Sequence, residues 1–133
     1  MSQKHIEGLR EDFDAFNRTG EINIDRLAPD FEMHQAASVI DTAGIFRGRD
    51  ALQQSLDELQ GAFEGLWFEA EKFFESPAGE IVVFVRVRGR GVGSGVEIDN
   101  RIAWVWTFRG VEAIRLAVYE EQTEPLEALG LRE

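Results

Sequence analysis

The sequence predicts a single α+β domain in which helices come first and a curved, largely antiparallel sheet follows. Apolar residues recur every three or four positions over residues 3–16 and 50–63, which is typical of amphipathic helices. From residue 66 onward they alternate with polar residues, as they do in strands. The separators between these strands are short, so neighbouring strands form antiparallel hairpins. A chain of 133 residues, 44% of them hydrophobic, suffices for one core, and no linker or repeat divides residues 1–133.

Three helices are expected before the long strands. The first covers residues 3–16, and Gly20 marks its end. A short second helix begins with Asn23 as its N-cap and ends before Pro29, and a strand follows over residues 30–36. The third helix begins at Asp50. Each of the two longer helices has an apolar stripe that is expected to face the sheet. The stripe of the first helix consists of Ile6, Leu9, Phe13 and Phe16, and that of the third consists of Leu52, Leu56, Leu59 and Phe63.

Four long strands are expected over residues 66–75, 80–90, 96–108 and 111–120, and a helical turn over residues 124–131 closes the chain. The alternation within these strands predicts which side chains face the helices. That face is expected to carry Phe84, Arg86, Arg88, Asn100, Ile102 and Trp104. The opposite face would have no cover, and its residues are Val83, Val85, Ala103, Val105, Ala117 and Tyr119. Because an exposed apolar patch of this kind marks an association surface, we expect a homodimer through the outer sheet face.

Charge and composition exclude several classes of partner. The 14 Lys and Arg against 25 Asp and Glu give a net charge of −11, so we expect neither nucleic acid nor a membrane surface as a partner. The absence of Cys rules out disulfides and thiolate metal sites. The longest apolar run, residues 81–85, is far shorter than the roughly 20 residues of a membrane span. The first residues lack the apolar segment of a signal peptide, so the expected location is the cytoplasm.

Four short motifs resemble those of a known superfamily. They are Phe-Asn-Arg-Thr-Gly at 16–20, Pro-Asp-Phe-Glu-Met-His at 29–34, Gly-Ile-Phe-Arg-Gly-Arg-Asp-Ala at 44–51, and Trp-Thr-Phe-Arg-Gly with the segment after it, at 106–131. In their order and spacing the chain resembles the SnoaL-like branch of the nuclear transport factor 2-like (NTF2-like) superfamily, which includes polyketide cyclases, ketosteroid isomerases and non-catalytic binding domains. The resemblance implies a cone-shaped α+β barrel, in which about three helices fold against a strongly curved sheet around a central pocket. It also implies frequent homodimerisation.

The resemblance further locates the positions that carry catalysis in relatives. In related epoxide hydrolases and cyclases an Asp on the closing strand works as acid or base, and the matching residue here is Val118. The epoxide hydrolases also place an Arg and an Asp two residues apart on the second long strand, where this chain has Arg86 and Arg88. Polar groups of the first strand correspond to Met33 and Gln35, of which only Gln35 forms hydrogen bonds. No residue is therefore predicted to be catalytic, and whether the protein is an enzyme stays open.

The predicted pocket combines arginines with aromatic and aliphatic walls. Its candidate ligand-binding residues are Met33, Gln35, Phe84, Arg86, Arg88, Asn100, Ile102, Trp104, Leu116 and Val118. Two guanidinium groups beside tryptophan suit a small hydrophobic, carbonyl-bearing or anionic molecule. Two alternatives remain for the arginines. They form ion pairs with carboxylates of the first helix, such as Glu11, Asp12 or Asp14, or the strand has the opposite phase and they lie on the surface.

The two histidines offer little chemistry. His34 lies beside Glu32 and is a candidate base, but it alternates with Met33 and is expected to point outward. His5 is expected to be exposed. The pair lacks the spacing of metal ligands, so no metal and no cofactor are expected. The expected function is a small-molecule-binding SnoaL-like domain, which as an enzyme would act on a hydrophobic carbonyl or anionic compound. The alternative is a non-catalytic ligand-binding or assembly domain.

Overall fold

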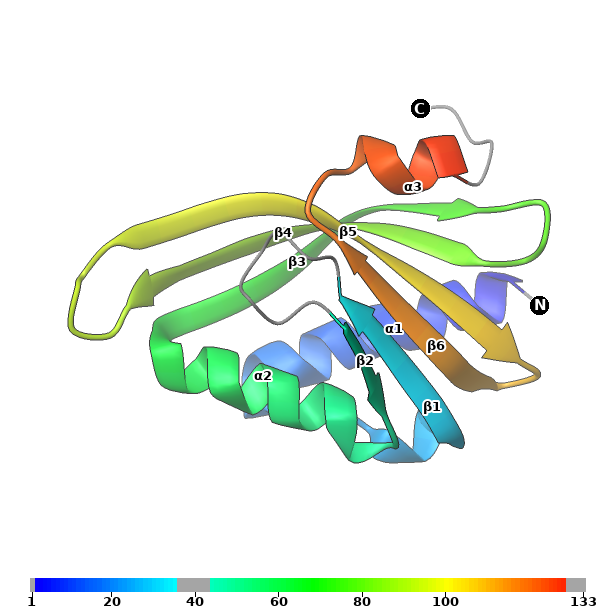
Figure 1. Ribbon diagram of the computed structural model, residues 1–133, viewed down its shortest axis with the longest axis horizontal. Coiled ribbons are helices and arrows are strands. Elements are labelled where there is room, and N and C mark those ends of the chain that lie inside the picture. Colours follow the sequence, from blue (N-terminus) through cyan, green and yellow to red (C-terminus); the bar gives the residue numbers. More distant parts are fainter. Residues whose placement is uncertain (1, 36–43, 129–133) are drawn as a thin grey trace.

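The computed structural model describes residues 2–35 and 44–128, and the elements that were predicted occur in the predicted order, with one further strand between them (Figure 1). The helical elements are α1 (Ser2–Thr19), the 3₁₀ turn η1 (Ile24–Arg26), α2 (Asp50–Ala62) and α3 (Thr123–Ala128). The strands are β1 (Leu27–Gln35), β2 (Gly44–Arg47), β3 (Phe63–Glu75), β4 (Ile81–Gly91), β5 (Glu97–Arg109) and β6 (Glu112–Tyr119). The predicted α+β class is therefore confirmed.

The strands form one mixed sheet of six strands, in the order β2-β1-β6-β5-β4-β3. The pairing of β1 with β6 is parallel, and the other four pairings are antiparallel. Figure 1 shows the long strands β3, β4 and β5 bending over α1 and α2, while α3 lies on the opposite side of the sheet. The described sheet is curved but not closed, since β2 and β3 are its two edges.

The ends of the early elements follow from the local sequence. Gly20 has a φ of 78°, which favours glycine, and its N–H donates to the carbonyl of Phe16 to end α1. Asn23 caps the next turn by accepting a hydrogen bond from the N–H of Asp25, as predicted. That turn is a single 3₁₀ turn rather than a helix, because Leu27 already pairs with Ala113 of β6.

The sequence did not predict β2, an edge strand that pairs with the end of β1. Its residues Ile45 and Phe46 are 49% and 39% exposed, so the strand has no alternation between a buried and an exposed face. The predicted end of the preceding strand, Ala36, lies outside the described residues, as do residues 129–131 of the predicted final helical turn.

The phase predicted for β4 relative to β5 is wrong. Val83 pairs with Trp104, and Val85 pairs with Ile102, so these valines share the helix-covered face with the tryptophans. Phe84 pairs with Ala103 on the other face, and the arginines that follow it in β4 also lie there. The prediction placed Phe84, Arg86 and Arg88 on the inner face, whereas the β-branched valines are the residues that pack under the helices.

Two hydrophobic clusters fill the two faces of the sheet. The inner cluster, beneath α1 and α2, includes Phe13, Phe16, Phe31, Leu52, Leu56, Phe68, Val83, Val85, Trp104, Trp106 and Leu116. The outer cluster consists of Val82, Phe84, Ala103, Val105 and Leu126, with Phe74, Ala117 and Tyr119 packed against it. Leu126 belongs to α3, so this helix covers the patch that was expected to be bare. Val105 is only 5% exposed, and Val83 and Val85 lie on the inner face.

Candidate functional site

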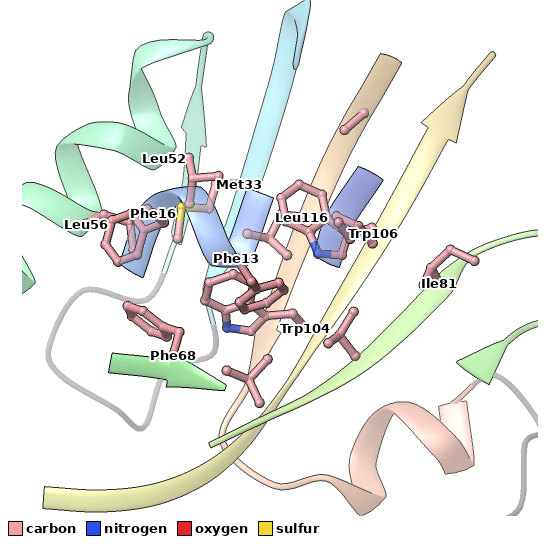
Figure 2. Packing of buried hydrophobic residues seen from close by; sticks show 14 of the residues in the cluster. Phe13, Phe16, Met33, Leu52, Leu56, Phe68, Ile81, Trp104, Trp106 and Leu116 are labelled. Carbon is pink, nitrogen blue, oxygen red and sulfur yellow. The ribbon is translucent and has the colours of Figure 1, made fainter. Parts of the chain in front are cut away.

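A cavity of about 190 Å³ lies between α1 and the helix-covered face of the sheet, and we call it the α1 cavity. Its walls come from α1, η1, β1, α2, β3, β5 and β6, and its apolar interior includes Leu9, Phe13, Phe16, Phe68, Trp104 and Trp106. Exposed residues mark its open side, namely Lys4, Asn23, Arg26 and Val111. In Figure 2, Phe13 of α1 lies close to Trp104, with 5.4 Å between the ring centroids.

Two indole groups in this cavity lack a hydrogen-bond partner. Trp104 and Trp106 are 8% and 6% exposed, and neither Nε1–H meets an acceptor among the residues that the structure describes. Both residues line the cavity. A buried donor left without an acceptor costs about 1–3 kcal/mol, and such groups are rare in native proteins. The cavity wall therefore contains two indole groups with unpaired N–H donors, and both nitrogens are buried beneath the surface of the cavity.

One carboxyl group, that of Asp12, lines the same cavity. Burial raises its pKa to about 6; Arg26 acts in the opposite direction and Glu11 raises the pKa further. The closest charged contact is with Arg26, whose Nε lies 3.7 Å from Oδ1 of Asp12. A carboxyl group with this pKa changes its charge close to neutral pH, which is unusual for Asp.

Arg26 lies at the open side of the cavity and pairs with carboxylates of α1. Its Nη2 donates to Oε2 of Glu11 at 3.1 Å, and its guanidinium group crosses α1 at Gly8. A Cβ at position 8 would meet Nη1 of Arg26, so a larger residue there would displace the end of this flexible side chain. Gly8 and Asp12 lie one helical turn apart, on the edge of α1 that faces Arg26.

His5 lies at the rim of the cavity and is half-buried, contrary to the expectation that it is exposed. Its ring stacks on Phe108 with 3.9 Å between centroids, and its Nε2 donates to the carbonyl of Gly110 at 2.8 Å. These two contacts hold the first turns of α1 against the turn between β5 and β6. One ring nitrogen of His5 is therefore used in a structural hydrogen bond.

Among the predicted ligand-binding residues, the inner face holds Met33, Ile102, Trp104, Leu116 and Val118. Of these five, Trp104 lines the α1 cavity, and the others pack in or against the inner cluster. Gln35 pairs through its backbone with Gly44 and Val118, and its side chain lies outside the described part of the chain. Asn100, opposite Val87, is exposed.

Phe84, Arg86 and Arg88 lie on the outer face, away from the α1 cavity. Arg86 forms a bidentate pair with Asp99, with Nε–Oδ1 and Nη2–Oδ2 distances of 2.8 and 2.6 Å. This pairing raises the pKa of Arg86 and lowers that of Asp99. Arg88 lies 3.7 Å from Glu69. The structure thus agrees with the alternative in which the strand has the opposite phase, and the partners are carboxylates of neighbouring strands rather than of α1.

His34 lies outside the cavity as well. Its Nε2 is 3.0 Å from Oε1 of Glu32, and the second carboxylate oxygen of Glu32 accepts from Nε of Arg47 at 3.2 Å. The hydrogen bond with His34, followed by the pair with Arg47, lowers the pKa of Glu32. Met33 between them is buried in the inner cluster, so His34 and Glu32 point to the outer face, as predicted.

Asp12 and Arg26 line the cavity, although the sequence did not predict either of them as a pocket residue. A signal for Asp12 is present, because Gly8 and Asp12 flank the apolar stripe of the first helix on one side. The position of Arg26 follows from the entry of the chain into β1, which local sequence does not encode. Over residues 2–35 and 44–128, no group of three or more His, Asp or Glu could hold a metal ion, and no described helix is long and apolar enough to cross a membrane.

No family model matches the sequence, and no curated protein matches it. Solved structures do match. An NTF2-like protein of unknown function from Burkholderia pseudomallei superposes with a TM-score of 0.71 at 21% identity, covering 94% of this chain and 96% of that chain. The chain has the NTF2-like fold.

Two further neighbours share this fold. The epoxide hydrolase/cyclase-like enzyme SalBIII has a TM-score of 0.72 at 14% identity, covering 93% of this chain and 97% of that chain. TerC, co-crystallised with polyporic acid, has a TM-score of 0.70 at 18% identity, covering 94% of this chain and 96% of that chain. The predicted resemblance to the NTF2-like superfamily is therefore confirmed at the level of the fold, and in this chain the α1 cavity lies on the helix-covered face of the NTF2-like sheet.

Proposed function

We propose that the α1 cavity binds a small, largely apolar molecule that carries one or two uncharged oxygen acceptors. The observation that carries this proposal is that Trp104 and Trp106 line the cavity and that their buried indole N–H groups have no acceptor among the described residues. An oxygen atom of a ligand would accept these hydrogen bonds and remove the cost of two unpaired buried donors.

The size and lining of the cavity define the ligand further. An engineered apolar cavity of about 150 Å³ is known to hold benzene, so a cavity of about 190 Å³ suits a substituted aromatic ring. Phe13, Phe68 and Trp104 offer faces and edges for ring contacts. One neighbour with the same fold was crystallised with polyporic acid, which supports a small organic ligand.

The aromatic residues of the predicted pocket include Trp104, which lines the α1 cavity, but the arginine at the cavity is not one of those predicted. Arg86 and Arg88 lie elsewhere, and the arginine that lines the cavity is Arg26, which pairs with two carboxylates of α1. A guanidinium group with two acidic neighbours offers less attraction to an anion than two arginines in the pocket would. We therefore favour an uncharged ligand over an anionic one, and ligand binding over an assembly role.

Acetophenone is a suitable probe, because it is an aromatic ring with one carbonyl oxygen. It should raise the melting temperature of the wild-type protein in a concentration-dependent manner. Ala113 is 3% exposed and lines the cavity, so Ala113→Phe should fill the cavity and abolish the effect. Ala117→Phe, the same change on the outer face of the same strand, should retain it. Equal stabilisation of Ala113→Phe and wild type would overturn the proposal.

A further inference from the structure

The only carboxyl group that lines the α1 cavity in the described part of the chain belongs to Asp12. Its side chain is 30% exposed, and it shares the cavity with the unpaired indole groups of Trp104 and Trp106. A ligand that hydrogen bonds to the tryptophans therefore lies in the same small space as this carboxyl group. Filling the cavity would bury the Asp12 side chain further.

The charges around Asp12 compensate it incompletely. Arg26 of η1 places Nη2 3.1 Å from Glu11 but Nε 3.7 Å from Asp12, so the shorter contact goes to the neighbour. From α1, Lys4 and His5 also line the cavity, and His5 donates to the carbonyl of Gly110. The lining residues contributed by α2, β3, β5 and β6 are uncharged, and they are Leu52, Leu56, Phe68, Trp104, Trp106, Phe108 and Ala113.

Building on the proposed function, we propose that Asp12 determines the charge of the ligand that the cavity accepts. In the complex, the carboxyl group of Asp12 carries a proton and donates a hydrogen bond to an uncharged oxygen-bearing ligand. The proton comes from the solvent and stays on Asp12, and no bond of the ligand breaks. Binding of the ligand is thus coupled to the uptake of a proton, and a carboxylate of the same shape is disfavoured.

Desolvation is the physical reason for this coupling. Burial already raises the pKa of Asp12 to about 6 without a ligand. Replacing the remaining water by an apolar molecule disfavours the charged form further. The neutral carboxyl group then adds a donor beside the two indole N–H groups, whereas an ionised Asp12 would repel a carboxylate ligand across a medium of low dielectric constant.

Calorimetric titration of the wild-type protein with acetophenone measures this coupling. Near pH 7, in two buffers of different ionisation enthalpy, the uptake should approach about one proton per acetophenone bound. The affinity should fall by up to about tenfold for each pH unit above 6. Asp12→Asn should abolish both effects, because an amide carries no ionisable proton. Asp14→Asn, the same change at an exposed position of α1, should retain both.

Benzoate provides the matched test of ligand charge, since it has the shape of acetophenone with a carboxylate in place of the methyl ketone. Wild type should prefer acetophenone by more than tenfold at pH 7, and Asp12→Asn should narrow that preference. Binding of acetophenone without proton uptake, or with the same uptake in Asp12→Asn, would overturn the role of Asp12 while leaving the proposed function intact. Failure of acetophenone to bind wild type at any pH would overturn the proposed function and this inference with it.

Discussion

Trp106 lies edge-on to Trp104, with 6.2 Å between their ring centroids and 66° between their ring planes. The two residues are two positions apart on β5, so both side chains point to the helix-covered face. Each indole is nine-tenths buried and keeps its N–H without an acceptor in the described part of the chain. A β-strand thereby places two adjacent indole rings, each with an unpaired N–H, in the wall of one apolar cavity.

Replacing Trp106 by Phe tests the value of one of these donors. The change removes an unpaired N–H and some buried ring surface, and these two effects on the free energy of unfolding oppose each other. We expect the stability without a ligand to change by no more than about 1 kcal/mol, while the affinity for acetophenone falls about three- to tenfold. Chemical denaturation and calorimetry measure the two quantities. Trp67→Phe, at a 45% exposed position of β3, should leave the affinity unchanged.

Asp12→Asn should change how stability depends on pH. The pKa of Asp12 is about 6 in the folded protein against 3.8 for an unperturbed Asp, so the folded state holds its proton to higher pH than the unfolded state does. Wild type therefore loses stability as the pH rises from about 4 to about 6, and Asp12→Asn avoids this loss. Allowing for partial exposure, we expect the variant to be about 1 kcal/mol more stable than wild type at pH 7 and no more stable at pH 4. A variant that is less stable than wild type at both pH values would contradict this expectation.

Arg86→Met should leave ligand binding unchanged, because Arg86 lies on the outer face and pairs with Asp99. The pair is exposed to solvent, so the wild-type protein should have a slightly higher melting temperature than the variant at low salt and the same one at about 1 M salt. Melting curves at the two salt concentrations and a titration with acetophenone measure both effects. A clear loss of acetophenone affinity in Arg86→Met would contradict this expectation and indicate that Arg86 contributes to ligand binding.

The phase of β4 shows where sequence reasoning failed and why. Alternation correctly predicted a strand over residues 80–90, but it gives two opposite faces without saying which one the helices cover. Apolar residues occupy both faces at the start of this strand, since Ile81, Val82, Val83 and Phe84 are all nearly inaccessible. The choice is made by the register with β5, in which Val83 lies beside Trp104, and that register is a long-range property.

Other parts of the fold were predictable because their signals are local. Gly20 ends α1 and Asn23 caps η1 through contacts within a few residues. The role of α3 was not predictable from local sequence. This six-residue helix covers the outer face because Leu126 packs with Val82 and Phe84, which are distant from it in the sequence. The α1 cavity also depends on such distant contacts, since α1 and β5 are separated by most of the chain.

The homodimer through the outer sheet face stays a prediction, and the structure changes the surface that it would use. With α3 in place the outer cluster is covered, so the uncovered part of this face carries the ion pairs of Arg86, Arg88 and Arg101. Leu126→Asp should release α3, because Leu126 is 5% exposed and the change buries a charge. The variant should self-associate more strongly than wild type in sedimentation experiments. A wild-type protein that sediments at the mass of one 15.0 kDa chain would contradict the homodimer.

The central claim is that the α1 cavity is the ligand site and that its two unpaired indole groups bind the ligand. The indole N–H signals in a ¹H–¹⁵N NMR spectrum test this claim most directly. The chain has three tryptophans, and Trp67 on the outer face serves as an internal control. On titration with acetophenone, the indole signals of Trp104 and Trp106 should shift in the direction expected for a new hydrogen bond, and the signal of Trp67 should stay. The account would be contradicted if acetophenone bound and shifted only the indole signal of Trp67, or if it bound and left the indole signals of both Trp104 and Trp106 unshifted.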